Sequence, residues 1–165
     1  MSEFAEIKNA YQSFPDKFQS VVIGTISKDG IPNASYAPCL VDESKNIYIY
    51  VSGLSLHTQN LLINPQASLL FIEDESETKQ IFARRRLNYE CRANLLERDT
   101  QTWLNIINHF EERFGELIKL LQDLPDFRIF QFQPYGGRFV VGFGNVFKVD
   151  PDDLNNLIQI TKDNK

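Results

Sequence analysis

SLHTQNLLINP, residues 55–65, carries clear signals for both the start and the end of a helix, and the elements on either side of it can be assigned relative to it. Ser55 is a typical N-cap, because its hydroxyl can accept a hydrogen bond from an early amide of the helix that follows. Pro65 has no amide hydrogen and disfavours helical geometry in the residue before it, so the helix cannot continue through Asn64. The segment therefore predicts a short helix over 55–63, about two turns long.

Strand-forming runs joined by a tight turn precede this helix. Residues 18–27 read FQSVVIGTIS, are rich in β-branched side chains, and stop just before Asp29 and Gly30. Asp-Gly is among the strongest short signals for a β-hairpin, so a returning strand is expected over 31–40. A further strand, NIYIYVS at 46–52, alternates branched and aromatic side chains and leads towards the helix.

The segment after the helix returns to strand patterns. Residues 66–72 are expected to form another strand, and the acidic stretch EDESE at 73–77 is expected to be a solvated turn. From about 85 to 96 the odd positions are apolar and the even positions mostly polar. This period of two predicts a long strand with one face buried.

The last third of the chain carries one strong helical pattern. Apolar residues recur at helical spacing after Thr100, which with Asp99 is a candidate cap. Strands over 127–133 and 138–143 should follow, joined at PYGG. No internal repeat or linker interrupts the sequence. We therefore expect one domain over 1–165: an N-terminal helix at 1–16, barrel strands within 18–98, a long helix at 99–123, closing strands at 126–147 and a C-terminal helix at 151–161.

Six or seven short antiparallel strands with a helix inserted late indicate a mainly β fold with flanking helices. The favoured arrangement is a small closed barrel with the helices packed outside it. Closure removes exposed sheet edges, which are a liability for a chain so rich in β-branched residues.

Bulk composition limits the kind of partner that the chain can have. The net charge of −5 argues against a general nucleic-acid binder, which needs a basic surface. Cys39 and Cys91 are too few and too far apart for a disulfide scaffold or a structural zinc site. The N-terminus lacks a signal-peptide pattern, and no apolar run approaches the roughly 20 residues that cross a bilayer. We expect a reduced cytoplasmic protein with no nucleic-acid or membrane partner.

Two motifs resemble a known superfamily. Residues 55–65, read as S-x-H-T-x-N-L-x-x-N-P, resemble the S-x-K-x-x-N-L-x-x-N-P signature of the pyridoxamine 5′-phosphate oxidase-like, FMN-binding split barrels. The hairpin sequence DGIPNASYAP at 29–38 is also similar to that superfamily. Further downstream, the runs KQIFARRRLNYECRA, LPDFRIFQFQP and GRFVVGFGNVF resemble its haem-utilisation branch, the HugZ/HutZ type. Together these matches cover roughly residues 18–155.

This resemblance implies a six- to seven-stranded antiparallel split barrel that works as a homodimer and holds a flat anionic cofactor at the dimer interface. The cofactor is either haem or FMN. The implied function is haem utilisation with a haem oxygenase-like activity. The alternatives are an FMN-dependent oxidoreductase and a non-catalytic carrier of haem or flavin. An oxidoreductase is the enzyme class that this resemblance favours.

The helix at 55–63 is the first candidate cofactor site, with Ser55, His57, Thr58 and Asn60 as its residues. Amides at a helix N-terminus are unpaired and the helix dipole favours an anion there, such as a phosphate or a propionate. His57 stands where the flavin signature has a lysine. It is expected to bond the anion or to pair across the interface, with Asp126 as a possible partner; otherwise it is an ordinary surface histidine.

Three consecutive arginines, 84–86, form the second candidate site. Strand alternation would place Arg84 and Arg86 on the polar face and turn Arg85 away. Arg84 and Arg86 could then clamp a flavin phosphate or haem propionates through charge-assisted hydrogen bonds. The alternative is a solvated strand start that balances the acidic stretch at 73–77.

A haem iron would also need an axial ligand, most often a histidine. The resemblance to the haem-utilisation branch implies that this ligand is a histidine of the C-terminal segment. The sequence after Phe147 contains no histidine. His57 is then a weak candidate ligand, and Cys39 is either a thiolate ligand or a small buried residue. His109 lies on the polar side of its helix and is expected at the surface. No catalytic residue can be assigned from the sequence.

Overall fold

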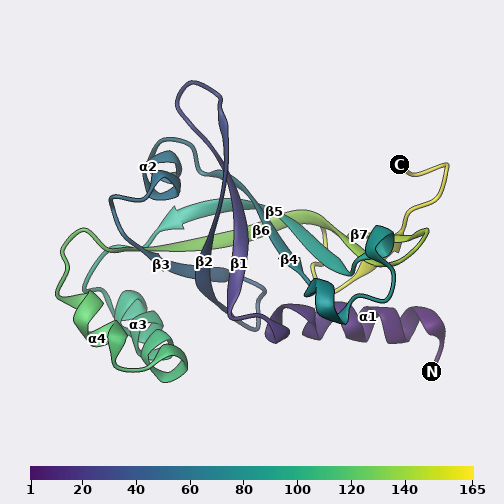
Figure 1. The fold of residues 1–165 in the computed structure, drawn as a ribbon, viewed down its shortest axis with the longest axis horizontal. Helices are drawn as coiled ribbons and strands as arrows, with labels where there is room; N and C mark the ends of the chain where they lie inside the picture. The colour runs from purple at the N-terminus through teal and green to yellow at the C-terminus, as the bar shows by residue number, and fades with distance from the viewer.

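The structure, a computed structural model, describes all 165 residues and consists of one eight-stranded antiparallel sheet with helices around it (Figure 1). The strand order is β3-β2-β1-β4-β5-β6-β7-β8, and an additional pairing of β3 with β6 closes the first six strands into a barrel. The strands are β1 (Ser20–Ile26), β2 (Pro32–Val41), β3 (Ile47–Val51), β4 (Gln66–Ile72), β5 (Arg86–Leu95), β6 (Arg128–Gly142), β7 (Asn145–Val149) and β8 (Leu157–Gln159). The predicted six- to seven-stranded antiparallel split barrel is confirmed.

Strand β3 shows how the barrel and the helices share one sheet. All five of its residues are buried, because Ile47, Ile49 and Val51 face the barrel interior while Tyr48 and Tyr50 face outward. The outward tyrosines are covered by two helices, α3 (Gln101–Phe114) and α4 (Leu117–Gln122). The period-two alternation therefore supplies two separate cores, one inside the barrel and one beneath α3 and α4.

The other two helices lie elsewhere around the barrel (Figure 1). Helix α1 (Glu3–Ser13) continues into a 3-10 turn, η1 (Phe14–Lys17), and packs Tyr11 and Phe14 into the barrel core. Helix α2 (Leu56–Ile63) lies on the far side of the barrel from α1, beneath the projecting β1–β2 hairpin. No helix is both long enough and apolar enough to cross a lipid bilayer.

The predicted long helix at 99–123 is wrong in one respect, because it is two helices. Thr100 caps α3 by accepting a hydrogen bond from the Trp103 amide. The helix then ends at Gly115, whose φ of 85° lies in the region that favours glycine. Ile118 resumes the apolar pattern from α4, so the continuous stripe in the sequence concealed the break.

The closing strands also differ from the prediction. PYGG is not a turn between two strands, since β6 runs unbroken through it and pairs with β3, β5 and β7 in succession. A Cβ on Gly137 would lie 2.2 Å from the Asn88 carbonyl oxygen, so the glycine permits close approach of β6 to β5. The turn comes later, around Gly144, and is followed by β7.

The predicted C-terminal helix at 151–161 is wrong. Carboxylates of Asp150 and Asp153 accept hydrogen bonds from the amides two residues on, those of Asp152 and Asn155. Such Asx turns compete with helix formation, and β8 then pairs with β7 so that Leu157 is buried.

Candidate functional site

Helix α2 is tied to the barrel by buried polar side chains. The Thr58 hydroxyl donates to the Ser52 carbonyl oxygen at 2.6 Å, and the Asn60 amide donates to the Thr25 hydroxyl at 3.0 Å. Thr58 and Asn60 are both buried. Because buried polar groups are costly when unpaired, these bonds fix the position of α2. Thr58 and Asn60 are therefore committed to the fold, whereas Ser55 occupies the N-cap position without a side-chain capping bond.

His57 is buried rather than at the surface, with 8% of its area exposed. Its Nδ1 lies 2.9 Å from the Ser35 Oγ of β2. Its Nε2 is the one buried side-chain nitrogen or oxygen in the protein without a hydrogen-bond partner. Burial lowers the pKa of His57, because it disfavours the charged imidazolium. The imidazole is thus neutral at neutral pH and links α2 to β2.

Asp126 packs against the segment between β3 and α2 but does not pair with His57 within the chain. Its carboxylate accepts a hydrogen bond from the Ser52 hydroxyl at 3.2 Å. Its backbone packs so closely on Gly53 that a Cβ there would lie 2.7 Å from the Asp126 carbonyl oxygen. The ion pairs of the protein are Arg84–Glu75 and Lys119–Glu111, so no carboxylate lies within 4.0 Å of the His57 ring.

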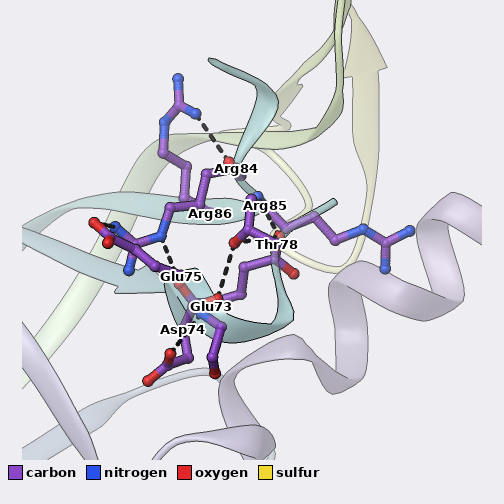
Figure 2. A network of polar contacts seen from close by, with 8 residues as sticks. Glu73, Asp74, Glu75, Thr78, Arg84, Arg85 and Arg86 are labelled. Atoms are coloured by element: carbon purple, nitrogen blue, oxygen red, sulfur yellow. Dashed lines mark hydrogen bonds and ion pairs between the residues drawn. The ribbon is translucent and has the colours of Figure 1, made fainter. Parts of the chain in front are cut away.

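The three arginines at the start of β5 point in different directions (Figure 2). Arg84 is engaged by the acidic stretch, because its Nε donates to the Glu73 carbonyl oxygen at 2.6 Å and its Nη1 lies 3.5 Å from the Glu75 carboxylate. The prediction that Arg84 balances the acidic stretch fits this geometry. The clamp by Arg84 stays a prediction, and its guanidinium would have to leave these partners.

Arg86 has fewer partners within the chain than Arg84 has. Its Nη1 donates to the Arg84 carbonyl oxygen at 2.9 Å, and no carboxylate pairs with it. Arg85 is exposed and points away from Arg84, while its backbone amide donates to the Glu73 carboxylate (Figure 2). Arg86 therefore keeps guanidinium donors that an anion could use.

One chain does not bring the two candidate sites together. Strand β4 begins just after α2 at Gln66 and ends at Ile72, which pairs with Arg86. Seven residues of strand span about 20 Å, so the α2 end and the arginine end lie on opposite sides of the molecule (Figure 1).

Of the remaining candidates, Cys39 and His109 lie apart from both ends, whereas the acidic stretch belongs to the arginine end. Cys39 is fully buried, and burial raises the pKa of its thiol to about 12, which fits the alternative of a small buried core residue. His109 is exposed on α3, where the sequence placed it. Glu75–Glu77 form a short 3-10 turn that closes on Arg84.

The hydroxyl partners Thr25, Ser35 and Ser52 were missed at the level of sequence. For Ser35 and Thr25 a signal existed, since alternation places Ser35 on the same face of β2 as the buried Ala37 and Cys39, and Thr25 on the same face of β1 as Val21 and Ile23. The pairing of Ser35 with His57 spans 22 residues and depends on how α2 folds over the sheet.

The chain belongs to the pyridoxamine 5′-phosphate oxidase family, whose sequence profile matches residues 7–141. Within that family it is similar to the haem oxygenase HutZ of Vibrio cholerae serotype O1, with 40% identity over 149 residues that make up 90% of this chain and 84% of that protein.

Solved structures agree with this placement. A crystal structure of HutZ from Vibrio cholerae, described as a haem storage protein, superposes with a TM-score of 0.72 at 39% identity and covers 81% of this chain and 91% of that one. The structure of Campylobacter jejuni ChuZ superposes with a TM-score of 0.86 at 30% identity over 100% of this chain and 66% of that chain. The expected membership of the haem-utilisation branch is confirmed by these relatives.

Proposed function

We propose that this protein is a haem-utilisation protein of the split-barrel family that binds haem between two copies of the chain and acts on it as an oxidoreductase. The observation that carries the proposal is the 40% identity to a haem oxygenase over 90% of the chain. The separation of the α2 end from the arginine end supports a site shared between two subunits.

A twofold homodimer can bring together ends that one chain keeps apart. In an isologous dimer in which the α2 end of one copy meets the arginine end of the other, symmetry produces two equal sites. The α2 end offers apolar surface for such an interface, since Leu54, Leu56, Leu62 and Ile63 are 84%, 53%, 53% and 61% exposed. Exposed apolar surface of this kind marks contact sites.

The residues present suit the anionic edge of the cofactor. Arg86 can form a charge-assisted bond to a propionate, and the early amides of α2, with the hydroxyl of Ser55, can receive a second anionic group. Thr58 and Asn60 then act indirectly, because they hold α2 in place.

The chain offers fewer candidate ligands for the haem iron than for the propionates. Neutral imidazole is the form that binds metals, and His57 is neutral. Its Nε2 is buried, however, so the groups that cover it would have to move before iron could reach it. His57 therefore remains a candidate ligand only for an opened α2 end.

Bound haem would supply the oxygen and electron chemistry, while the chain binds it, orients it and limits access of water. The relative HutZ has been described both as a haem oxygenase and as a haem storage protein. A turnover assay with haem, a reductant and oxygen separates the two for this chain, since only an oxygenase consumes the haem.

FMN-dependent oxidation is the second candidate function. The family profile over residues 7–141 favours it, and the α2 amides would face the flavin phosphate. The neutral, buried His57 counts against it, because no fixed cation stands where the flavin signature has a lysine.

Parallel absorption titrations of the purified protein with haemin and with FMN test the proposal. We expect a sharpened Soret band that saturates at one haem for each chain. Flavin bands that saturate with quenched fluorescence, and no specific haem signal, would assign the protein to the FMN oxidoreductases instead.

A further inference from the structure

The arginine end carries two of the most exposed aromatic side chains of the protein. Phe82, in the 3-10 turn η3 (Ile81–Ala83), is 85% exposed, and Phe143, at the tip of the β6–β7 hairpin, is 82% exposed. Ile81 is 56% exposed. Single exposed apolar residues are ordinary, but two nearly bare phenyl rings on neighbouring loops indicate a surface that something covers.

The two loops share a cavity of about 350 Å³, which Phe143, Ala83 and Gln80 help to line. Lys79 and Arg85 also line it, and neither side chain takes part in an ion pair. The ligand that this surface suits is therefore apolar and carries negative charge.

Two carboxylates, those of Glu73 and Glu77, line the same cavity. Glu73 is already occupied, since its Oε1 accepts hydrogen bonds from the Arg85 amide and the Thr78 hydroxyl. Glu77 is the second carboxylate of the lining. The formal charges of the two carboxylates and of Lys79 and Arg85 cancel, but neither cation forms an ion pair, so both keep donors that an anionic ligand could use.

Phe143 is connected to Arg86 through the sheet. Arg86 pairs with Val140 on β6, and the chain continues from there to Phe143 three residues later. Phe143 lies in the turn directly after β6, and three residues of chain reach at most about 11 Å, which is comparable to the width of a flat aromatic cofactor. An anion held at Arg86 would place the body of a planar ligand within reach of the exposed phenyl rings.

We propose that Phe82 and Phe143, with the aliphatic Ile81 beside Phe82, form an aromatic cover over one face of the planar cofactor whose anionic edge is bound by Arg86 of the same chain. The inference rests on the proposed function, since it names the apolar half of the same site. A flat ring system packs well against phenyl groups, and its edge charge matches Arg85, Arg86 and Lys79.

The substitutions Phe143→Ala and Phe82→Ala, each followed by haemin and FMN titration, test this cover. Each should weaken the binding of the cofactor that the wild-type protein takes by about tenfold, because a stacked aromatic contact is lost. Leu120→Ala is the matched control, since Leu120 is 68% exposed on α4, which lies away from the arginine end (Figure 1). It should leave the affinity unchanged.

A second variant reports contact rather than affinity. Phe143→Trp places an indole where bound haem or flavin would quench its emission at short range. The native Trp103 lies on the buried face of α3 and provides the background in the wild-type protein. We expect cofactor to quench the variant more strongly than the wild type.

Each outcome has a distinct meaning. Unchanged affinity in both alanine variants, or equal quenching in the tryptophan variant, overturns the aromatic cover while leaving the proposed function intact. Dissociation of the dimer by Phe143→Ala, seen by sedimentation, shows that a second copy covers the rings and also overturns it. If the wild-type protein itself binds neither haem nor FMN, the proposed function fails, and the cover fails with it.

Discussion

The α2 end and the arginine end of the barrel were both predicted as cofactor sites from the sequence, but their polar side chains differ in burial and in hydrogen bonding. At the α2 end, His57, Thr58 and Asn60 are buried, neutral and bonded within the chain, apart from one ring nitrogen of His57. At the arginine end, Arg85 is exposed and Arg86 keeps free donors beside bare phenyl rings. Polar groups of the first kind stabilise the fold, and those of the second kind are available to a ligand.

The largest expected effect comes from the α2 end. Asn60→Ala removes the amide that donates to Thr25 and leaves a small cavity and an unpaired hydroxyl in the barrel wall. The free energy of unfolding should fall by roughly 3 kcal/mol, measured by urea denaturation. Asn94→Ala is the control, because its bond to Gln133 lies at the surface, and it should cost less than about 0.5 kcal/mol.

Arg86→Ala should show the reverse pattern. Loss of a charge-assisted bond weakens cofactor binding by roughly 2 kcal/mol, or about thirtyfold, while the unfolding free energy and the dimer stay unchanged. Arg92→Ala, on an exposed position of the same strand, should leave binding unaltered. Equal affinities for the two variants would remove Arg86 from the site.

How far the sequence predicted these features depends on the range of the interactions. Local patterns were sufficient for α2, the Asp-Gly hairpin and the alternating strand β5. The C-terminal segment was misread because the Asx turns at Asp150 and Asp153 resemble a helix start. The commitment of Thr58 and Asn60 to the fold depended on partners such as Thr25, 35 residues away, and no local pattern reveals it.

A smaller effect, confined to a pH window, should come from His57. Burial in the folded state lowers the pKa of His57 below its ordinary value of 6.5. The unfolded chain therefore binds the proton more readily than the folded one. The contribution of His57 to stability is complete above pH 6.5 and is lost as the pH falls from 6.5 towards the lowered pKa. Urea denaturation across this window should show the loss in the wild type and less of it in His57→Gln. The exposed His109→Gln control should keep the wild-type slope.

The smallest effect is expected at the Arg84–Glu75 pair. The two groups are 3.5 Å apart, and the Glu75 side chain is 73% exposed, so solvent screens their attraction. Glu75→Gln should change the unfolding free energy by less than about 0.5 kcal/mol. Cofactor affinity should stay within about twofold, because Arg84 still donates to the Glu73 carbonyl oxygen. A large gain in affinity would show that the acidic stretch holds Arg84 back from the site.

The central claim is that one cofactor site takes its α2 end and its arginine end from different copies of the chain. Mixed dimers test it directly. Ser55→Asp keeps a good N-cap but repels an anion at α2, and Arg86→Ala removes the clamp at the other end, so each parent dimer should bind cofactor weakly.

In a mixed dimer of these two variants, a shared site would combine the intact α2 end of one copy with the intact Arg86 of the other. Cofactor titration should then recover wild-type affinity at half of the sites. If both ends served a cofactor within one chain, the mixed dimer would bind no better than its parents, and the shared site would be contradicted.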